Sequence, residues 1–476
     1  MGAVRNRGVV TGALVAVVLA GSLTGCEVDP VRSTIARPAD PVVVRGADVP
    51  RLAEGPADRV VAFRAASGGW TQIPVQVDER LDTTMADVYD LPPDAFGNSS
   101  IGIDVNVYAD PGTFVGADPD PTVDADDEIA FMARDAGGSA VEAGLGAPGG
   151  TVPGTGIEVR LDEPGVAGQR GYVYLFRGDG TLDPAAGRSY VDYDFDLASG
   201  DYTSTYRRRS GPNPEDSTIT GASYTAHFSD RWLMDGVTLS FGDRPGVDLV
   251  DRMKYRLVPG VCGRSEDTFN TGEGAFVVNK VGPIRALRGY VGANSGPNTQ
   301  ATHAFYDLRF DTSIDLRVHG IPGVAAYLDL GREATGMTFR NPEVPSGVTV
   351  DGQPDAVPAG APTWWTLDGP QGGLGTALSV ETDLSTDPRT RYDDDLTPAT
   401  AQCTGDGEAI GEAGAAFGTL ACTDPGMLPG SPGCTHRFRT TTATVATPAG
   451  QGDGALVRAW TDDARTPLEV STSTFG

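Results

Sequence analysis

The stretch Val191-Asp-Tyr-Asp-Phe-Asp-Leu197 alternates strictly between apolar and acidic side chains. Successive side chains of a β-strand point to opposite faces of a sheet, so the stretch presents one apolar face and one face of aspartates. This pattern predicts a half-buried strand of an antiparallel sheet. Turn clusters at 178–180 and 212–214 flank the stretch, and similar segments recur along the chain. The other predicted strands are 103–108, 171–176, 237–241 and 276–278.

The glycine and proline content extends this prediction to the whole chain. The 476 residues include 64 glycines and 35 prolines, and no amphipathic helix of three turns is predicted after residue 26. We therefore expect an all-β fold of antiparallel β-sandwich domains, the larger of them long enough for a supersandwich. The glycine-rich run 137–156 predicts a boundary between a small β-sandwich domain at 41–136 and a large β-sandwich region at 155–476. A second break near 342–362 would divide the large region.

The N-terminus carries the features of a bacterial lipoprotein signal peptide. Arg5 and Arg7 precede an apolar run at 8–23, which is too short to span a membrane stably, and the run ends in Leu23-Thr-Gly-Cys26. We predict a signal peptide at 1–25, cleavage before Cys26, and attachment to the Cys26 thiol of a diacylglycerol that carries fatty acids such as palmitate. Residues 26–40 would form a linker, and two or three acyl chains would hold the protein on the extracellular face of the cell membrane. An ordinary signal peptide followed by a free cysteine is the alternative.

The charge balance excludes some classes of partner. The chain has a formal net charge of −28, so it repels nucleic acid and anionic lipid headgroups, and we expect no nucleic-acid partner. Its 39% of apolar residues suffice for a folded core.

Four cysteines follow Cys26, and an even number in an exported chain predicts two disulfides. The closest pairing would join two of the three late cysteines and link Cys262 to the third. A zinc site is the alternative, but the spacings lack a Cys-x-x-Cys pattern. The four residues are Cys262, Cys403, Cys422 and Cys434.

The loop at 118–128 places six carboxylates in eleven residues. Calcium takes six to eight oxygen ligands, and such a loop could supply them to a structural ion. The spacing departs from the EF-hand pattern, and a solvated acidic loop is the alternative. The predicted ligands are Asp118, Asp120, Asp124, Asp126, Asp127 and Glu128.

The stretch 305–319 alternates apolar residues with charged ones. We interpret it as a hairpin with the loop 311–313, which would pair Arg309 with Asp315 and Asp307 with Arg317 across the strands. Structural charge pairing explains this face without a substrate. The functional alternative is a groove in which histidine acts as acid or base and arginine grips a carboxylate. The candidate catalytic residues are His303, Arg309, Arg317 and His319.

Trp364 and Trp365 would point to opposite faces of a strand, so one of them could offer a stacking platform for a sugar ring. Packing under loops is the alternative. The chain has no Gly-x-Ser-x-Gly elbow, phosphate loop or His-Glu-x-x-His motif.

Two sets of motifs resemble known families. Gln72–Glu79 followed by Asp126–Asp135 resembles the opening β-domain of secreted bacterial proteins of uncharacterised type, some of which are similar to carbohydrate-active proteins. Gly282–Arg285 and the 303–319 stretch resemble the β-supersandwich of galactose-mutarotase-like and polysaccharide-lyase proteins. The resemblance implies a fold, and it brings no catalytic motif that matches residue by residue.

Two functional hypotheses follow. The first is a surface-anchored, non-catalytic lipoprotein that binds carbohydrate or a cell-envelope partner. The second is an extracellular lyase or hydrolase that acts on polysaccharide through the polar face of 303–319.

Overall fold

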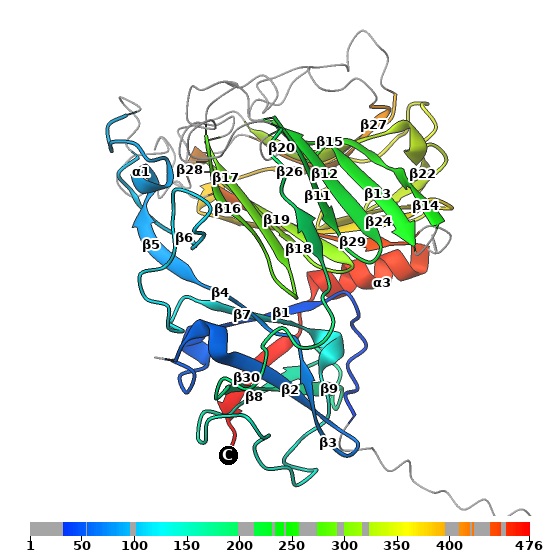
Figure 1. Cartoon of the computed structure of the whole chain (residues 1–476). Helices are drawn as coiled ribbons and strands as arrows, with labels where there is room; N and C mark the ends of the chain where they lie inside the picture. Colours follow the sequence, from blue (N-terminus) through cyan, green and yellow to red (C-terminus); the bar gives the residue numbers. More distant parts are fainter. Residues whose placement is uncertain are drawn as a thin grey trace, which may run out of the picture.

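The computed structural model describes residues 32–476 except residue 54 and the segments 96–100, 199–213, 231–233, 242–243, 257–273, 293–298, 317–322, 396–408, 419–420, 423–437 and 449–453. Within these residues the chain forms two stacked β-sandwiches, which we call the small body and the large body. The small body lies at the bottom of Figure 1 and the large body at the top.

The small body consists of two antiparallel sheets around one apolar core. Its three-stranded sheet has the order β1 (Pro41–Arg45), β7 (Glu128–Met132), β4 (Gln76–Asp78). Its five-stranded sheet has the order β3 (Gly69–Ile73), β2 (Val60–Ala66), β9 (Arg170–Arg177), β8 (Ile157–Asp162), β30 (Glu469–Thr474).

The large body is a sandwich of three sheets. Its nine-stranded sheet has the order β16 (Ala275–Val281), β17 (Ala286–Val291), β18 (Gln300–Phe305), β19 (Arg309–Leu316), β29 (Phe438–Thr447), β24 (Gly372–Thr382), β23 (Trp364–Gly369), β21 (Thr338–Arg340), β22 (Val348–Thr349). Its five-stranded sheet has the order β10 (Asp192–Asp194), β11 (Pro214–Thr220), β12 (Tyr224–Asp230), β13 (Gly236–Phe241), β14 (Arg244–Asp248). Its four-stranded sheet has the order β15 (Val250–Arg256), β20 (Val324–Leu330), β27 (Gly411–Phe417), β26 (Pro388–Asp393). One apolar core contains residues from all three sheets.

The remaining elements are short, apart from one helix. They are β5 (Arg80–Thr84), β6 (Asp104–Tyr108), β25 (Leu384–Ser385), β28 (Ala421–Cys422), the helices α1 (Met85–Val88) and α3 (Gly454–Arg465), and 3-10 turns at Gly46–Asp48, Ala57–Arg59, Ala133–Asp135 and Arg332–Ala334.

The predicted all-β class is confirmed. Each predicted strand coincides with an observed one: β6, β9, β10, β13 and β16. The stretch 191–197 contains β10, in which Asp192 and Asp194 are exposed, while Val191 belongs to the core of the large body. The predicted strands are therefore present, and in β6 and β10 the period-two pattern also identified the exposed face, whereas 171–176 in β9 and 276–278 in β16 are buried on both faces.

The sheets do not follow the predicted division of the chain at 137–156. Strands β8 and β9 lie beyond that run and pair with β2 and the C-terminal strand β30 in one sheet of the small body. In the other direction, α1 and β6 precede the run, yet Met85, Val88 and Val105 pack into the core of the large body. The run 137–156 is therefore a loop within the small body and not a domain boundary. Its glycine content could not show this, because the pairing of strands depends on contacts distant in sequence.

The predicted linker 26–40 is shorter than expected. The Thr34 N–H donates to the Arg170 carbonyl at 2.9 Å, and Ile35 packs against the core of the small body. Arg37 is 4% exposed, and its guanidinium contacts Glu163 of the small body and donates to the Asp463 carbonyl at the end of α3. Residues 34–40 are thus part of the folded protein.

The helix α3 corrects the prediction that no helix of three turns follows residue 26. It lies against the outer face of the nine-stranded sheet, beside β23, β24 and β29 (Figure 1). Val457 and Thr461, one turn apart, form its buried face. Leu456, Val457 and Trp460 stand at helical spacing, and this amphipathic pattern is the signal that could have predicted the helix. No helix in the described part of the chain is long and apolar enough to span a membrane.

Candidate functional site

A cleft of about 870 Å³ lies where the small body meets the large body. We call it the junction cleft. Its walls come from the small body, from the connecting segment after β9, and from the turn between β16 and β17 of the large body. The lining residues are Pro56, Ala57, Asp58, Arg59, Val60, Val75, Gln76, Val77, Asp78, Glu79, Pro121, Asp183, Pro184, Ala185, Lys280, Val281, Gly282 and Pro283.

The floor of the junction cleft is held by two motifs from opposite bodies. The Gln76 side-chain carbonyl accepts hydrogen bonds from the backbone N–H groups of Ile284 and Arg285, at 3.1 and 3.0 Å. The Gln76 amide donates to the Asp78 carboxylate at 3.0 Å. A Cβ at Gly282 would overlap the Gln76 carboxamide, so a larger residue there would displace the side chain that makes these hydrogen bonds. The strand β4 is thereby fixed against the β16–β17 turn.

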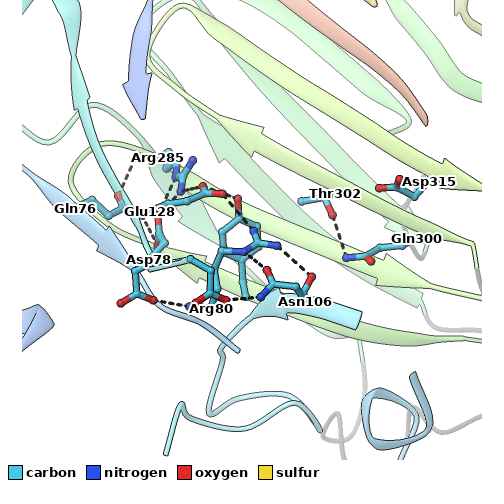
Figure 2. Close-up of polar contacts among 12 residues, drawn as sticks. Gln76, Asp78, Arg80, Asn106, Glu128, Arg285, Gln300, Thr302 and Asp315 are labelled. Atoms are coloured by element: carbon cyan, nitrogen blue, oxygen red, sulfur yellow. Dashed lines mark hydrogen bonds and ion pairs between the residues drawn. The ribbon is translucent and has the colours of Figure 1, made fainter. Parts of the chain in front are cut away.

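A buried ion pair completes this connection. Arg285 donates to Asp78 at 2.8 Å and to Glu128 at 2.7 Å, and its side chain is 3% exposed (Figure 2). Tyr108 donates to the same Glu128 carboxylate at 2.9 Å. We call Gln76, Asp78, Glu128 and Arg285 the junction clamp. Because its charges are buried, paired and hydrogen-bonded, the clamp holds the two walls of the cleft in one relative position.

Around the clamp, Arg80 links β5 to its neighbours (Figure 2). The Arg80 guanidinium donates to the Asn106 side chain at 2.6 Å and lies 4.3 Å from the ring centre of Tyr108. It also forms an ion pair with Glu128 at 3.3 Å.

The junction cleft carries more negative than positive charge. Burial alone would raise the pKa of Asp78, but the Arg285 guanidinium and the Lys280 ammonium hold that pKa below its ordinary value. The Lys280 ammonium lies 3.0 Å from the Asp78 carboxylate and forms an ion pair with it. Burial, together with repulsion from Asp127 and Asp118, raises the pKa of Glu79. Nearby positive charge therefore does not fully compensate the Glu79 carboxylate.

The acidic loop at 118–128 uses its carboxylates to hold backbone groups. Asp118 accepts from the Asp120 N–H at 2.8 Å, and buried Asp127 accepts from the N–H groups of Arg80 and Asp124 at 2.9 and 3.0 Å. The hydrogen bond shared with Asp126 raises the pKa of Asp124 to about 6. Within the described residues no three carboxylate, histidine or cysteine side chains gather in a metal-binding arrangement. Calcium binding by this loop stays a prediction.

The predicted hairpin at 305–319 is wrong in its register. The turn lies at 306–308, where Phe305 pairs with Phe310, and β19 continues through 311–313. Thr312 and Ser313 lie within this strand, and half-buried and buried side chains alternate without a break from 309 to 316.

The charged residues of this face consequently have other partners. Arg309 pairs with Asp311 on the same strand at 2.6 Å, and Arg439 of β29 pairs with Asp315 at 2.8 Å. Asp307 is 1% exposed and contacts Arg134 of the small body.

The candidate catalytic residues within the described part of the chain do not line an open groove. His303 is fully buried, its Nδ1 lies 2.8 Å from the Thr312 hydroxyl, and its ring packs beside Phe228. The Arg309 guanidinium is held by Asp311 and Asp40. A solvent-borne polysaccharide therefore cannot reach His303, and Arg309 serves in structural ion pairs.

The expectation of a sugar-stacking tryptophan is also corrected. Trp364 and Trp365 are only 6% and 5% exposed. Trp365 belongs to the large core, and the Arg458 guanidinium of α3 lies 3.3 Å from the ring centre of Trp364. The helix α3, which was not predicted from the sequence, covers the indole of Trp364.

Several predicted sites lie outside the described residues. They are Cys26, Cys262, Cys403, Cys434, Arg317 and His319. The backbone of Cys422 lies in β28, but its side chain is not described.

The junction cleft was not predicted from the sequence, although residues of its clamp lie in two motifs of the sequence. Gln72–Glu79 and Gly282–Arg285 carry two separate resemblances in the sequence, and the structure brings them into contact. Asp78 and Arg285 are 207 positions apart, so no local pattern could connect them.

Comparison with known proteins gives only distant likenesses. No family model matches the chain, and no curated protein matches its sequence. One similar solved structure is that of HI1317, with 7% identity and a TM-score of 0.31, covering 54% of this chain and 100% of that one. Another is the Slr1438 protein from Synechocystis sp. PCC 6803, with 8% identity and a TM-score of 0.27, covering 52% and 99%. A third is galactose 1-epimerase from Lactobacillus acidophilus NCFM, with 11% identity and a TM-score of 0.28, covering 54% and 99%.

Proposed function

We propose that this protein is a lipid-anchored, non-catalytic binding protein of the bacterial cell surface and that the junction cleft receives a carbohydrate or another partner from the cell envelope. The observation that carries the proposal is the cleft, whose volume of about 870 Å³ lies in the range of ligand-binding sites. The buried clamp supports binding, because a site whose walls are already fixed loses little freedom when a partner enters.

The proposed location rests on the N-terminal sequence. Acylation of Cys26 would hold the protein outside the cell, where envelope polymers and proteins are accessible. Metabolic labelling with a palmitate analogue tests this part: we expect label on the wild-type chain and none on Cys26→Ser.

The cleft is tested by filling it. Ala185 is exposed and lines the cleft, so Ala185→Trp would place an indole in the space that the partner needs. Ala459 is exposed on α3, away from the cleft, and Ala459→Trp is the matched control. Both full-length variants are probed with a glycan array, peptidoglycan fragments and synthetic extended peptides.

We expect at least one probe class to bind the wild-type chain and the control, and to bind Ala185→Trp much more weakly. Equal binding by all three proteins, or no binding of any class to the wild-type chain, would contradict the assignment of the cleft.

A further inference from the structure

We propose that the partner in the junction cleft is an extended polypeptide segment with basic side chains, which adds as a strand to the free edge of β4. This inference rests on the proposed function and specifies the class of partner. It is carried by the hydrogen-bond register of the three-stranded sheet and by the charge of the cleft.

The register of β7 determines which backbone groups face each neighbouring strand. In an antiparallel pair, residues bond alternately to one neighbour and to the other. The Gly46 N–H donates to the Asp127 carbonyl at 2.9 Å, and the Ala133 N–H donates to the Asp40 carbonyl at 3.0 Å. The odd-numbered residues of β7 therefore bond toward β1, and its even-numbered residues bond toward β4.

The same alternation turns Val77 outward. In β4, Gln76 and Asp78 stand opposite the even-numbered residues of β7 and exchange hydrogen bonds with them, whereas Val77 stands opposite Ile129. The N–H and C=O of Val77 consequently point away from β7, toward the cleft that Val77 lines.

The flanking residues confirm this direction. The Val75 N–H donates to the Pro184 carbonyl at 3.2 Å, and the Glu79 carbonyl accepts from the Ala109 N–H at 2.9 Å. Between these two contacts, the backbone N–H and C=O of Val77 have no hydrogen-bond partner within the described part of the chain. A free strand edge inside a cleft is the feature that strand-adding peptides use.

The walls beside this edge favour a basic partner. Asp58, Glu79 and Asp183 line the cleft, and Arg59 is the cation beside them, since Lys280 is paired with Asp78. The Asp58 side chain is 80% exposed and its contact with Arg59 is long, at 3.6 Å. Alternate side chains of an added strand would point into these acidic walls, so lysine or arginine at every second position is complementary.

The test measures binding of a probe peptide, acetyl-Lys-Val-Lys-Val-Lys-Val-Lys-amide, to the full chain by fluorescence anisotropy. Val77→Pro removes the outward N–H without removing a bond to β7, because proline is tolerated where an edge N–H faces outward. Val43→Pro is the matched control, since Val43 stands opposite Ala130 and directs its N–H away from the opposite edge of the same sheet. Val77→Ala keeps the N–H while trimming the side chain.

We expect the Kd to rise about tenfold in Val77→Pro and to stay within about threefold in Val43→Pro and Val77→Ala. A wild-type arm covers the case in which Val77→Pro does not fold: the same peptide with every backbone amide N-methylated should also lose about tenfold. A glutamate-for-lysine version should not bind measurably.

Equal affinity of the methylated and unmethylated peptides would overturn strand addition, and equal affinity of the glutamate version would overturn the basic partner. Absence of peptide binding, with glycan binding that Ala185→Trp abolishes, would overturn this inference while leaving the proposed function intact.

Discussion

At the scale of single residues, the junction clamp depends on the Arg285 guanidinium, because water in its place would not supply the positive charge. Arg285→Ala would leave Asp78 and Glu128 without their main counter-charge in a buried setting. We expect the unfolding free energy to fall by about 3–5 kcal/mol, as measured by urea unfolding. The control is Arg389→Ala, because the Arg389–Asp387 pair is 60% and 64% exposed and should contribute less than about 1 kcal/mol. Similar losses in both variants would contradict the importance of the clamp.

His227 gives the protein a pH-dependent contact on the five-stranded sheet of the large body. Its Nδ1 lies 2.7 Å from Asp235 and its Nε2 lies 2.9 Å from Asp216. The Asp235 hydrogen bond leads the effects that raise the pKa of His227 to about 9, above the ordinary value of 6.5. Between these values the folded protein binds the proton more tightly than the unfolded chain does.

The stabilisation from His227 is therefore fully present below about pH 6.5 and is lost as the pH rises through about 9. We expect the difference in unfolding free energy between wild type and His227→Gln to shrink over this range in urea titrations. A difference that stays constant from pH 6 to pH 10 would show that the histidine is not charged in the fold.

At the scale of elements, the contact between α3 and β24 depends on glycines in the strand. A Cβ at Gly375 would overlap the Thr461 hydroxyl and lie 2.9 Å from a methyl group of Val457. We expect Gly375→Ala to lower the unfolding free energy by about 1–3 kcal/mol through overpacking, although alanine is otherwise the better strand residue. Thermal and urea unfolding measure this effect.

Two variants give the comparison for this contact. A Cβ at Gly146 would meet nothing within 4 Å, so Gly146→Ala should be close to neutral. The double variant Gly375→Ala with Thr461→Ala should recover part of the loss. An additive or larger loss in the double variant would show that the helix does not rest on this glycine.

At the scale of the whole molecule, the three sheets of the large body lie in the sequence between β9 and β30, two strands of one small-body sheet. The C-terminal strand β30 pairs with β8, and Phe475 packs 4.9 Å from Tyr174 and 5.7 Å from Trp70, measured between ring centres. A chain that ends at Arg465 should therefore lose protection in the small body, while the large body keeps its sheets.

Limited trypsin digestion with mass spectrometry tests this arrangement. We expect cleavage at Arg160, Arg170 and Arg177 to accelerate about tenfold or more in the truncated chain, because opening of the sheet exposes these sites. A chain that lacks only Gly476 is the control. Unchanged cleavage at all three arginines would contradict the structural role of β30.

The chain by itself determined the strands and the fold class. Alternation at 103–108 and 191–197 identified buried and exposed faces because a strand imposes period two on its own residues. The same local information does not specify strand partners, so it predicts the wrong register for the hairpin at 305–319 and a domain boundary at 137–156. It also could not show that α3 covers Trp364 or that His303 is buried.

The tertiary structure alone decided where a partner can bind. The junction cleft exists because Gln76 and Asp78 meet a turn more than two hundred residues away, and because the pairing of β4 with β7 turns Val77 outward. Neither fact has a local signature, since both depend on which segments the chain brings together. Periodicity is a property of one strand, whereas a cleft and a free strand edge are properties of the space between strands.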